Sequence, residues 1–101
     1  MSFLPIYEET LSADGSTSWT SVKGPVWVSL SGTFGSGTAK IQRKNNAGAA
    51  VDIVGESHTV IADRVIDFPE KSVNEVRVNI ASSTSPALVT SIQWTSPDKV
   101  L

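Results

Sequence analysis

The feature that most constrains this fold is the strict alternation of apolar and polar residues along short segments. In "PVWVSLSG", residues 25–32, Val26, Val28 and Leu30 point to one side, and Trp27 and Ser29 point to the other. An extended strand places successive side chains on opposite faces, so a period of two is typical of a strand with one buried face. The same pattern predicts further inward-facing sets: Ala39 and Ile41; Val76, Val78 and Ile80; Leu88, Thr90, Ile92 and Trp94.

Between these segments lie clusters of Gly, Pro, Asn, Asp and Ser, which are turn-forming residues. They recur about every 8 to 12 residues, the interval expected of an antiparallel sandwich or barrel. A short helical turn at residues 69–75, with Pro69 in its first position, is the one exception that the sequence suggests. We therefore predict an all-β fold, a two-sheet antiparallel β-sandwich of about eight strands with jelly-roll or immunoglobulin-like topology. Shorter strands are expected at 6–11, 17–22, 51–54, 58–62 and 64–68.

Length and composition fit one β-sandwich domain over residues 1–101, because 101 residues with 40% hydrophobic content can bury a single core. The chain has no cysteine, so neither a disulfide nor a thiolate metal ligand is available. The net charge of -2 and the absence of a basic stripe argue against nucleic acid as a partner. No apolar run approaches the roughly 20 residues of a membrane span, and "MSFLPIYEE" lacks a signal-peptide pattern. We therefore expect no membrane partner and synthesis in the cytoplasm.

The stretch "SADGSTSW", residues 12–19, partly matches the Asp-box hairpin of sialidase-like propellers. Asp14 and Trp19 fit that pattern, whereas Ser16 stands where Gly is expected. The Asp-Gly pair is sufficient for a tight Asx-type turn after which Trp19 returns toward the core. The stretch "KNNAGAAV", residues 44–51, has the same spacing and looks like a worn second copy. We therefore predict two similar hairpins with a structural role.

Candidate catalytic groups are few, and each has a structural explanation. His58 is the only histidine and has no cysteine beside it, so we do not expect a zinc site. We expect His58 to lie at the edge of a strand instead. The Gly-rich segment 32–37 lacks the Gly-Lys-Ser/Thr end of a phosphate loop. Scattered carboxylates could supply the pair that glycoside hydrolysis needs, although solvated surface acids account for them equally well. The candidate carboxylates for such a pair are Asp52, Glu56, Asp63, Asp67, Glu70 and Glu75. We predict that the protein is not an enzyme and binds neither a cofactor nor a metal.

Several aromatic and apolar residues outside the alternating sets are candidates for a partner interface. Phe34, at the apex of the Gly-rich hairpin, is expected to be an exposed anchor. Trp27 lies on the polar side of its strand, so either it forms a contact patch for a sugar or a protein, or the second sheet's edge or an N-terminal arm covers it. Apolar ends suggest interacting arms at 1–7 and 97–101, although a first edge strand would also explain Ile6. The predicted interface comprises Phe3, Leu4, Ile6, Trp27, Phe34, Val100 and Leu101.

From "LSADGSTSWTSVKGPVWVSLSGTFGSGTAKIQRKNNAGAAVDIVGESHTV" to "EVRVNIASSTSPALVTSIQW", the sequence resembles a group of small virion proteins of tailed bacteriophages. The likeness covers roughly residues 10 to 95. It rests on a "DGST-W" opening, a "GPV-VS-SG-FGSGT" hairpin, an "-IQR" strand, a Gly-rich turn and a closing "VRV" and Ser-rich pair. The second hairpin departs from the pattern, because Ala50 and Val51 replace an expected Thr-Trp or similar pair.

The resemblance implies a non-enzymatic structural protein present in many copies, or as a homo-oligomer, in a virion assembled in the host cytoplasm. The foremost expectation is a capsid decoration or cement protein that bridges major-capsid subunits, with the major capsid protein or other virion subunits as partners. One alternative is a tail or neck accessory protein. Another is a carbohydrate-binding sandwich that uses Trp19, Trp27 or Trp94 as stacking platforms. A small hydrolase is the most remote alternative.

Overall fold

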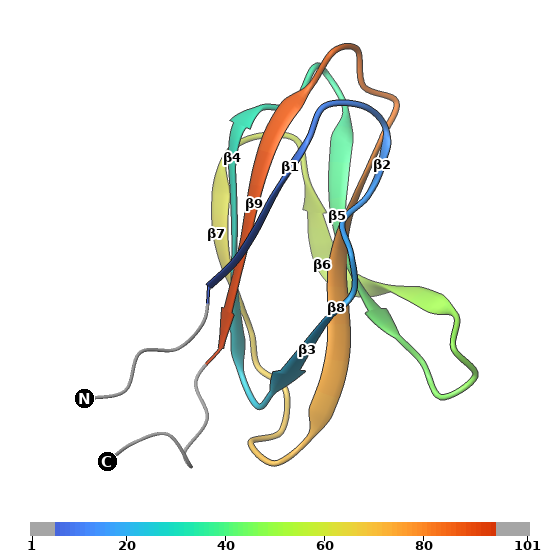
Figure 1. The fold of residues 1–101 in the computed structure, drawn as a ribbon, viewed down its shortest axis with the longest axis vertical. Helices are drawn as coiled ribbons and strands as arrows, with labels where there is room; N and C mark the ends of the chain where they lie inside the picture. The colour runs from blue at the N-terminus through green and yellow to red at the C-terminus, as the bar shows by residue number, and fades with distance from the viewer. Residues whose placement is uncertain (1–5, 95–101) are drawn as a thin grey trace.

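The computed structural model describes residues 6–94, which form an all-β structure (Figure 1). The predicted two-sheet sandwich is confirmed, and the described residues contain no helix long and apolar enough to cross a membrane. The strands are β1 (Ile6–Leu11), β2 (Gly15–Ser16), β3 (Thr20–Lys23), β4 (Val26–Thr33), β5 (Thr38–Lys44), β6 (Ala50–His58), β7 (Ala62–Ile66), β8 (Val73–Ala81) and β9 (Ala87–Trp94).

The strand order decides between the two topologies that the sequence left open. Sheet A has the order β1-β9-β4-β7, and sheet B has the order β2-β8-β5-β6, with β3 also pairing with β8. All of these pairings are antiparallel. Among the nine described strands, only β5 and β6 form a hairpin within one sheet. The segments β2 and β3 also belong to one sheet, and every other connection between these strands crosses to the opposite sheet. This winding is that of a jelly roll, because an immunoglobulin-like sandwich would place its first two strands in the same sheet.

The core lies between the two sheets and is built from the alternating residues that the sequence indicated. Val28 of β4 lies opposite Ile92 of β9 in sheet A, and Ile41 of β5 lies opposite Val78 of β8 in sheet B. All four side chains are at most 1% exposed. Ile53, Phe68 and Trp94 are partly buried and pack against this core. The inward faces were therefore predicted correctly, because burial of one face is what produces a period of two.

The segment 12–19 is not the predicted hairpin. It leaves β1 in sheet A and enters β2 in sheet B, so it crosses the end of the sandwich. Asp14 Oδ1 accepts a hydrogen bond from the Ser83 backbone N–H at 3.0 Å and another from the Ser83 hydroxyl, which ties this crossing to the β8–β9 loop. These bonds lower the pKa of Asp14, the side-chain bond from Ser83 contributing most.

The second predicted hairpin is present and joins β5 to β6. Its turn is held by Asn45, whose Oδ1 accepts hydrogen bonds from the backbone N–H groups of Ala47 and Ala49, each at 2.9 Å. Gly48 has a φ of 86°, a left-handed conformation that favours glycine. The two Asp-box-like stretches thus have different structures, because only the second connects neighbours in one sheet.

Two further sequence predictions are corrected. Residues 58–62 do not form a strand, because β6 ends at His58 and residues 59–61 form the connection to β7. Residues 69–75 contain no helical turn: the Ser72 N–H donates to the Pro69 carbonyl at 2.9 Å in a tight turn, and β8 begins at Val73.

A large bulge interrupts the pairing of β6 with β5. Gln42 lies opposite Asp52 and Lys40 lies opposite Ser57, so the four residues 53–56 face Ile41 alone. Gly55 within this bulge has a φ of 83°, and Val54 beside it is 96% exposed. Bulges bend a strand and redirect its side chains. Here the bulge brings Glu56 to a buried position at the edge of the sandwich.

Candidate functional site

The outer face of sheet A presents an exposed tryptophan. Trp27 on β4 is 44% exposed and lies between Val65 of β7 and Gln93 of β9. Together with Ser29, Asp63 and Gln93, Trp27 lines a shallow recess of about 570 Å³. This volume lies within the range of about 300 to 1,000 Å³ that is typical of small-ligand sites. The sequence left two covers open for Trp27, the edge of the second sheet or an N-terminal arm. Among the described residues the edge of the second sheet does not cover it, and the segment 1–5 of the arm lies outside these residues.

The other two tryptophans are engaged within the fold. The ring of Trp19 has the Arg77 guanidinium carbon 4.5 Å from its centroid and the Lys44 Nζ 5.0 Å from it, so both cations contact its π system. Trp94 is partly buried against the hydrophobic core. Among the three proposed stacking platforms, Trp27 is thus the most accessible one.

Phe34 is not the exposed anchor that the Gly-rich segment suggested. Its side chain is only 7% exposed and belongs to the core. The Gly37 N–H donates to the Phe34 carbonyl at 2.9 Å, which closes a tight turn. The Thr84 N–H donates to the Gly35 carbonyl at 2.8 Å, so the β8–β9 loop packs onto this turn. The predicted exposure was wrong because the Phe34 side chain packs into the hydrophobic core, at a turn that the distant β8–β9 loop contacts.

A groove lies between the β4–β5 and β6–β7 connections; we call it the loop-end groove. It is lined by residues 32–36 and 59–61 and has a volume of about 590 Å³. Val60 and Ile61 in its wall are 69% and 66% exposed. Sequence reasoning missed this pair, although one signal was present: adjacent apolar residues in an extended segment cannot both face the same core.

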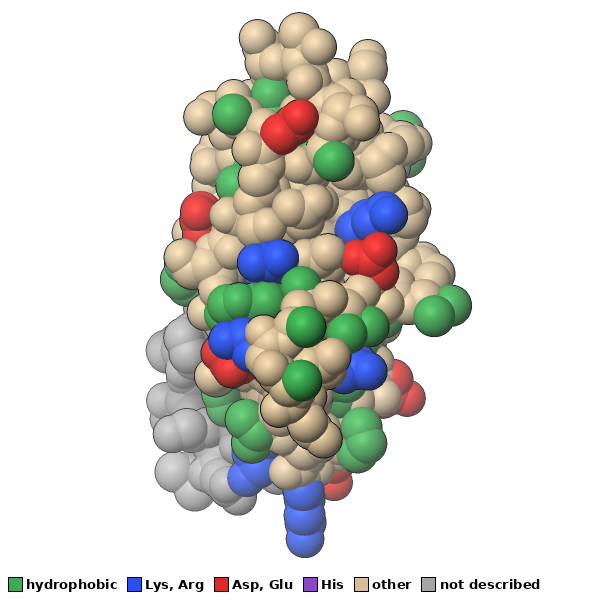
Figure 2. Space-filling model, turned by 90° about the vertical axis from the view of Figure 1, so that its right-hand side faces the viewer, with side chains coloured by type: hydrophobic (Ala, Val, Ile, Leu, Met, Phe, Trp, Pro, Cys, Tyr) green, Lys and Arg blue, Asp and Glu red, His purple; other side chains and the backbone are tan. Residues whose placement is uncertain are grey.

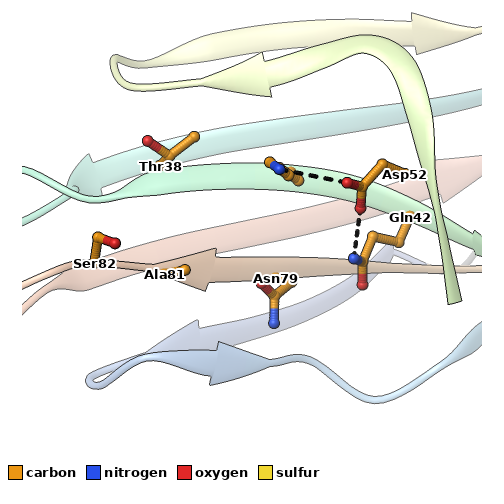
Figure 3. A pocket seen from close by; sticks show the side chains of 7 residues that line it. Thr38, Gln42, Asp52, Asn79, Ala81 and Ser82 are labelled. Carbon is orange, nitrogen blue, oxygen red and sulfur yellow. Dashed lines mark hydrogen bonds and ion pairs between the residues drawn. The ribbon is translucent and has the colours of Figure 1, made fainter.

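The outer face of sheet B carries charged side chains of both signs, which lie close together in the middle of this face (Figure 2). Asp52 Oδ1 accepts a hydrogen bond from the Gln42 amide at 2.7 Å, and Lys40 Nζ lies 3.4 Å from Asp52 Oδ2. Arg77 Nε donates in turn to Gln42 Oε1 at 2.8 Å. Figure 3 shows the Asp52 carboxylate beside the amide of Gln42, with Asn79 nearby. These residues line a polar recess of about 330 Å³. The bond from Gln42 is the main cause of the lowered pKa of Asp52.

Glu56 joins the two sheets at the open edge between β6 and β7. Its side chain is only 7% exposed. Arg64 of β7 donates to it through Nε at 2.8 Å and through Nη2 at 3.0 Å, and His58 Nε2 lies 2.9 Å from Oε1. The Arg64 bonds are the main cause of the lowered pKa of Glu56 and outweigh the opposing effect of burial. A bidentate arginine–carboxylate contact of this kind also fixes the relative position of the two strands.

The candidate carboxylates are dispersed over the molecule. Asp52 and Glu75 pair with lysines on the outer face of sheet B, Glu56 lies at the edge, and Asp63 lies on the outer face of sheet A. Asp67 and Glu70 belong to the connection between β7 and β8. Asp52 and Glu56 therefore cannot be a catalytic pair across one cleft, because the bulge between them sends one outward and the other inward.

Most residues of the predicted terminal arms, 1–7 and 97–101, lie outside the described residues. Ile6 and Tyr7 belong to β1, where they pair with Gln93 and Ile92, so these two residues are part of sheet A and not of a free arm. The edge-strand explanation for Ile6 is thus correct. Phe3, Leu4, Val100 and Leu101, like the whole segment 97–101, lie outside the described residues.

Comparison of the chain with protein-family models, with curated proteins and with solved structures finds no match in any of the three.

Proposed function

We propose that this chain is a non-enzymatic structural protein of the virion of a tailed bacteriophage, and that it decorates the head by bridging major-capsid subunits. The single observation that carries the proposal is the loop-end groove with its two exposed apolar side chains, Val60 and Ile61. Exposed apolar groups beside a concave surface are typical of contacts with another protein. That this other protein is a major-capsid subunit is proposed from the sequence resemblance to virion proteins.

The rest of the surface supports a structural role in two ways. Three of the candidate catalytic carboxylates, Asp52, Glu56 and Glu75, are used in ion pairs that hold strands together. The jelly roll is also an architecture that occurs in viral capsid proteins and lectins, although such an analogy speaks for the fold and not for a particular activity.

If many copies of the protein bind one shell, a small contact at each loop-end groove would be sufficient for attachment. A stable protein interface buries about 800 Å² on each partner, more than one groove with two exposed side chains provides. A protein that contacts several subunits of a symmetric shell gains avidity, because each further contact forms at a high effective concentration. Removing one apolar pair should therefore weaken retention strongly.

The test is co-sedimentation of the full chain with empty capsids, for the wild type and for the double variant Val60→Ser/Ile61→Ser. Val73→Ser is the matched control, because Val73 is 68% exposed, similar to Val60, but lies at the start of β8, at the opposite end of the sandwich. We expect the wild type and the control to sediment with heads and to raise capsid survival on heating. The double variant should be lost from the pellet.

Two outcomes would contradict the proposal. If the wild type neither binds heads nor protects them but is found in purified tails, the protein is a tail or neck accessory component. If the double variant and the wild type sediment equally, the loop-end groove is not the attachment surface.

A further inference from the structure

The outer face of sheet A has a recess that shares no lining residue with the loop-end groove, and this recess has the chemistry of a ligand site. Trp27 and Val65 are neighbours across β4 and β7, and they are 44% and 52% exposed. The other outward residues of β4 and β9 near them are small or polar: Ser29, Ser91 and Gln93. An aromatic side chain thus lies open in a polar surface, where burying it against a partner would be favourable.

The polar side chains around Trp27 are available for a ligand. The Asp63 carboxylate, the Gln93 amide and the Ser29 hydroxyl line the same recess, and their side chains form no hydrogen bond with another residue of the segment 6–94. On sheet B, in contrast, Gln42 and Asp52 satisfy each other at 2.7 Å. The recess of sheet A therefore offers an acceptor, an amide that both donates and accepts, and a hydroxyl, all without competing partners in the described chain.

This combination fits a pyranose ring. A sugar ring has an apolar C–H face that can stack on an indole, and hydroxyl groups at its rim that donate to a carboxylate and exchange hydrogen bonds with an amide. Binding sites for small molecules combine one apolar surface with a few placed polar groups in this way. The open form of the recess suits one or two units of a longer chain, because the sheet face on either side of it does not close over a ligand.

A protein partner fits this face less well. The two apolar side chains, Trp27 and Val65, lie among polar ones, and a protein that buried this face would also have to satisfy the Asp63 carboxylate, the Gln93 amide and the Ser29 hydroxyl. The backbone of β4 is also paired on both sides, with β7 and with β9, so it cannot recruit a further strand. The observations favour a ligand that buries one ring face and satisfies polar groups at its rim.

We propose that the recess on the outer face of sheet A binds a neutral pyranose unit of an oligosaccharide, stacked on Trp27 and hydrogen-bonded by Asp63 and Gln93. This goes beyond attachment to a capsid and does not depend on it, because the loop-end groove and this recess share no lining residue. A virion protein with both surfaces would hold the particle with one and contact a glycan with the other.

In the experiment, the full chain is titrated separately with maltohexaose, cellohexaose and chitohexaose. Binding is measured by calorimetry and by tryptophan fluorescence. We expect at least one of the three to bind with a dissociation constant below about 1 mM and to change the emission. Trp27→Ala should weaken that binding by roughly tenfold or more, and Asp63→Asn and Gln93→Ala by several-fold each. Trp27→Phe, which retains an aromatic face, should restore part of the affinity.

The controls separate this proposal from the capsid proposal and from misfolding. Trp94→Phe should leave both affinity and the emission change in place, because Trp94 packs against the core. Trp27→Ala should still sediment with capsids like the wild type, and its denaturation curve checks that it is folded. The proposal is overturned if none of the three sugars binds at about 10 mM, or if Trp27→Ala and Asp63→Asn both bind as tightly as the wild type.

Discussion

Replacing Glu56 with glutamine tests whether the buried contact between β6 and β7 holds the open edge of the sandwich together. Glu56 is 7% exposed and is approached at 2.8, 3.0 and 2.9 Å by two nitrogens of Arg64 and one of His58. Glutamine keeps the shape and one acceptor oxygen but removes the negative charge. The variant therefore isolates the contribution of the charge from that of packing.

The expected loss is modest because Arg64 is 43% exposed and can be hydrated when its partner is neutral. A hydrogen bond to a charged group contributes about 1.5–3 kcal/mol, and glutamine retains part of this network. We expect the free energy of unfolding to fall by about 1–2 kcal/mol near pH 7. In a domain of this size, each kcal/mol corresponds to about 4–8 °C in Tm.

The pH dependence has a definite sign. The pKa of Glu56 in the folded protein lies below its ordinary value of 4.5, so the folded state favours the ionised form. The stability that this charge contributes is fully present above the ordinary pKa and is lost as the pH falls through the lower, folded-state pKa. The difference between wild type and Glu56→Gln should therefore be constant from pH 7 to about pH 5 and shrink at more acid pH.

The assay is urea unfolding followed by tryptophan fluorescence between pH 3 and pH 7 for the wild type, Glu56→Gln and Glu8→Gln. Glu8 is an exposed carboxylate on β1, so its replacement should change stability by less than about 0.5 kcal/mol. The reasoning is refuted if Glu56→Gln is as stable as the wild type at pH 7, or if its deficit does not diminish on acidification.

Two further predictions concern the core and a close backbone contact. Truncation to Ala of a side chain at the centre of an alternating set should lower the free energy of unfolding by about 1–4 kcal/mol, because the four side chains named at the end of this paragraph are each at most 1% exposed. Chemical denaturation measures this loss, and unchanged stability in all four variants would show that the inward faces are misassigned. Gly32→Ala should destabilise far more than Gly48→Ala, although both have a left-handed φ, because a Cβ at Gly32 would lie 2.2 Å from the Ala87 carbonyl oxygen and one at Gly48 would meet no atom within 4 Å. Equal losses of Tm in the two glycine variants would contradict the close approach of β4 to β9. The core positions to truncate are Val28, Ile41, Val78 and Ile92.

The sequence by itself determined the fold class and the buried faces. Burial of one side of a sheet imposes a period of two, and turn residues mark where each strand ends, so both signals are local and can be read without knowing which strands are neighbours. Val28 and Ile41 were placed in the core on this basis, and Trp27 on the opposite face of its strand.

The partners of each strand were decided only in the tertiary structure. The alternation of apolar and polar residues is the same in a jelly roll and in an immunoglobulin-like sandwich. It therefore does not reveal that residues 12–14 cross between the sheets whereas residues 45–49 form a turn within one sheet. The bulge that buries Glu56 also depends on pairing with β5, because a strand read alone has no register.

For the candidate sites too, the sequence indicated which residues were apolar or aromatic, and only the tertiary structure decided which of them are exposed. Phe34, Trp19 and Trp94 appeared in the sequence as aromatic residues available to a partner, yet the fold covers or engages each of them with residues that are distant in the chain. Val60 and Ile61 appeared as part of a strand, yet they are exposed at a loop. The physical reason is that exposure depends on which segments pack together, and for a fold whose connections mostly cross between sheets those contacts join residues far apart in the sequence.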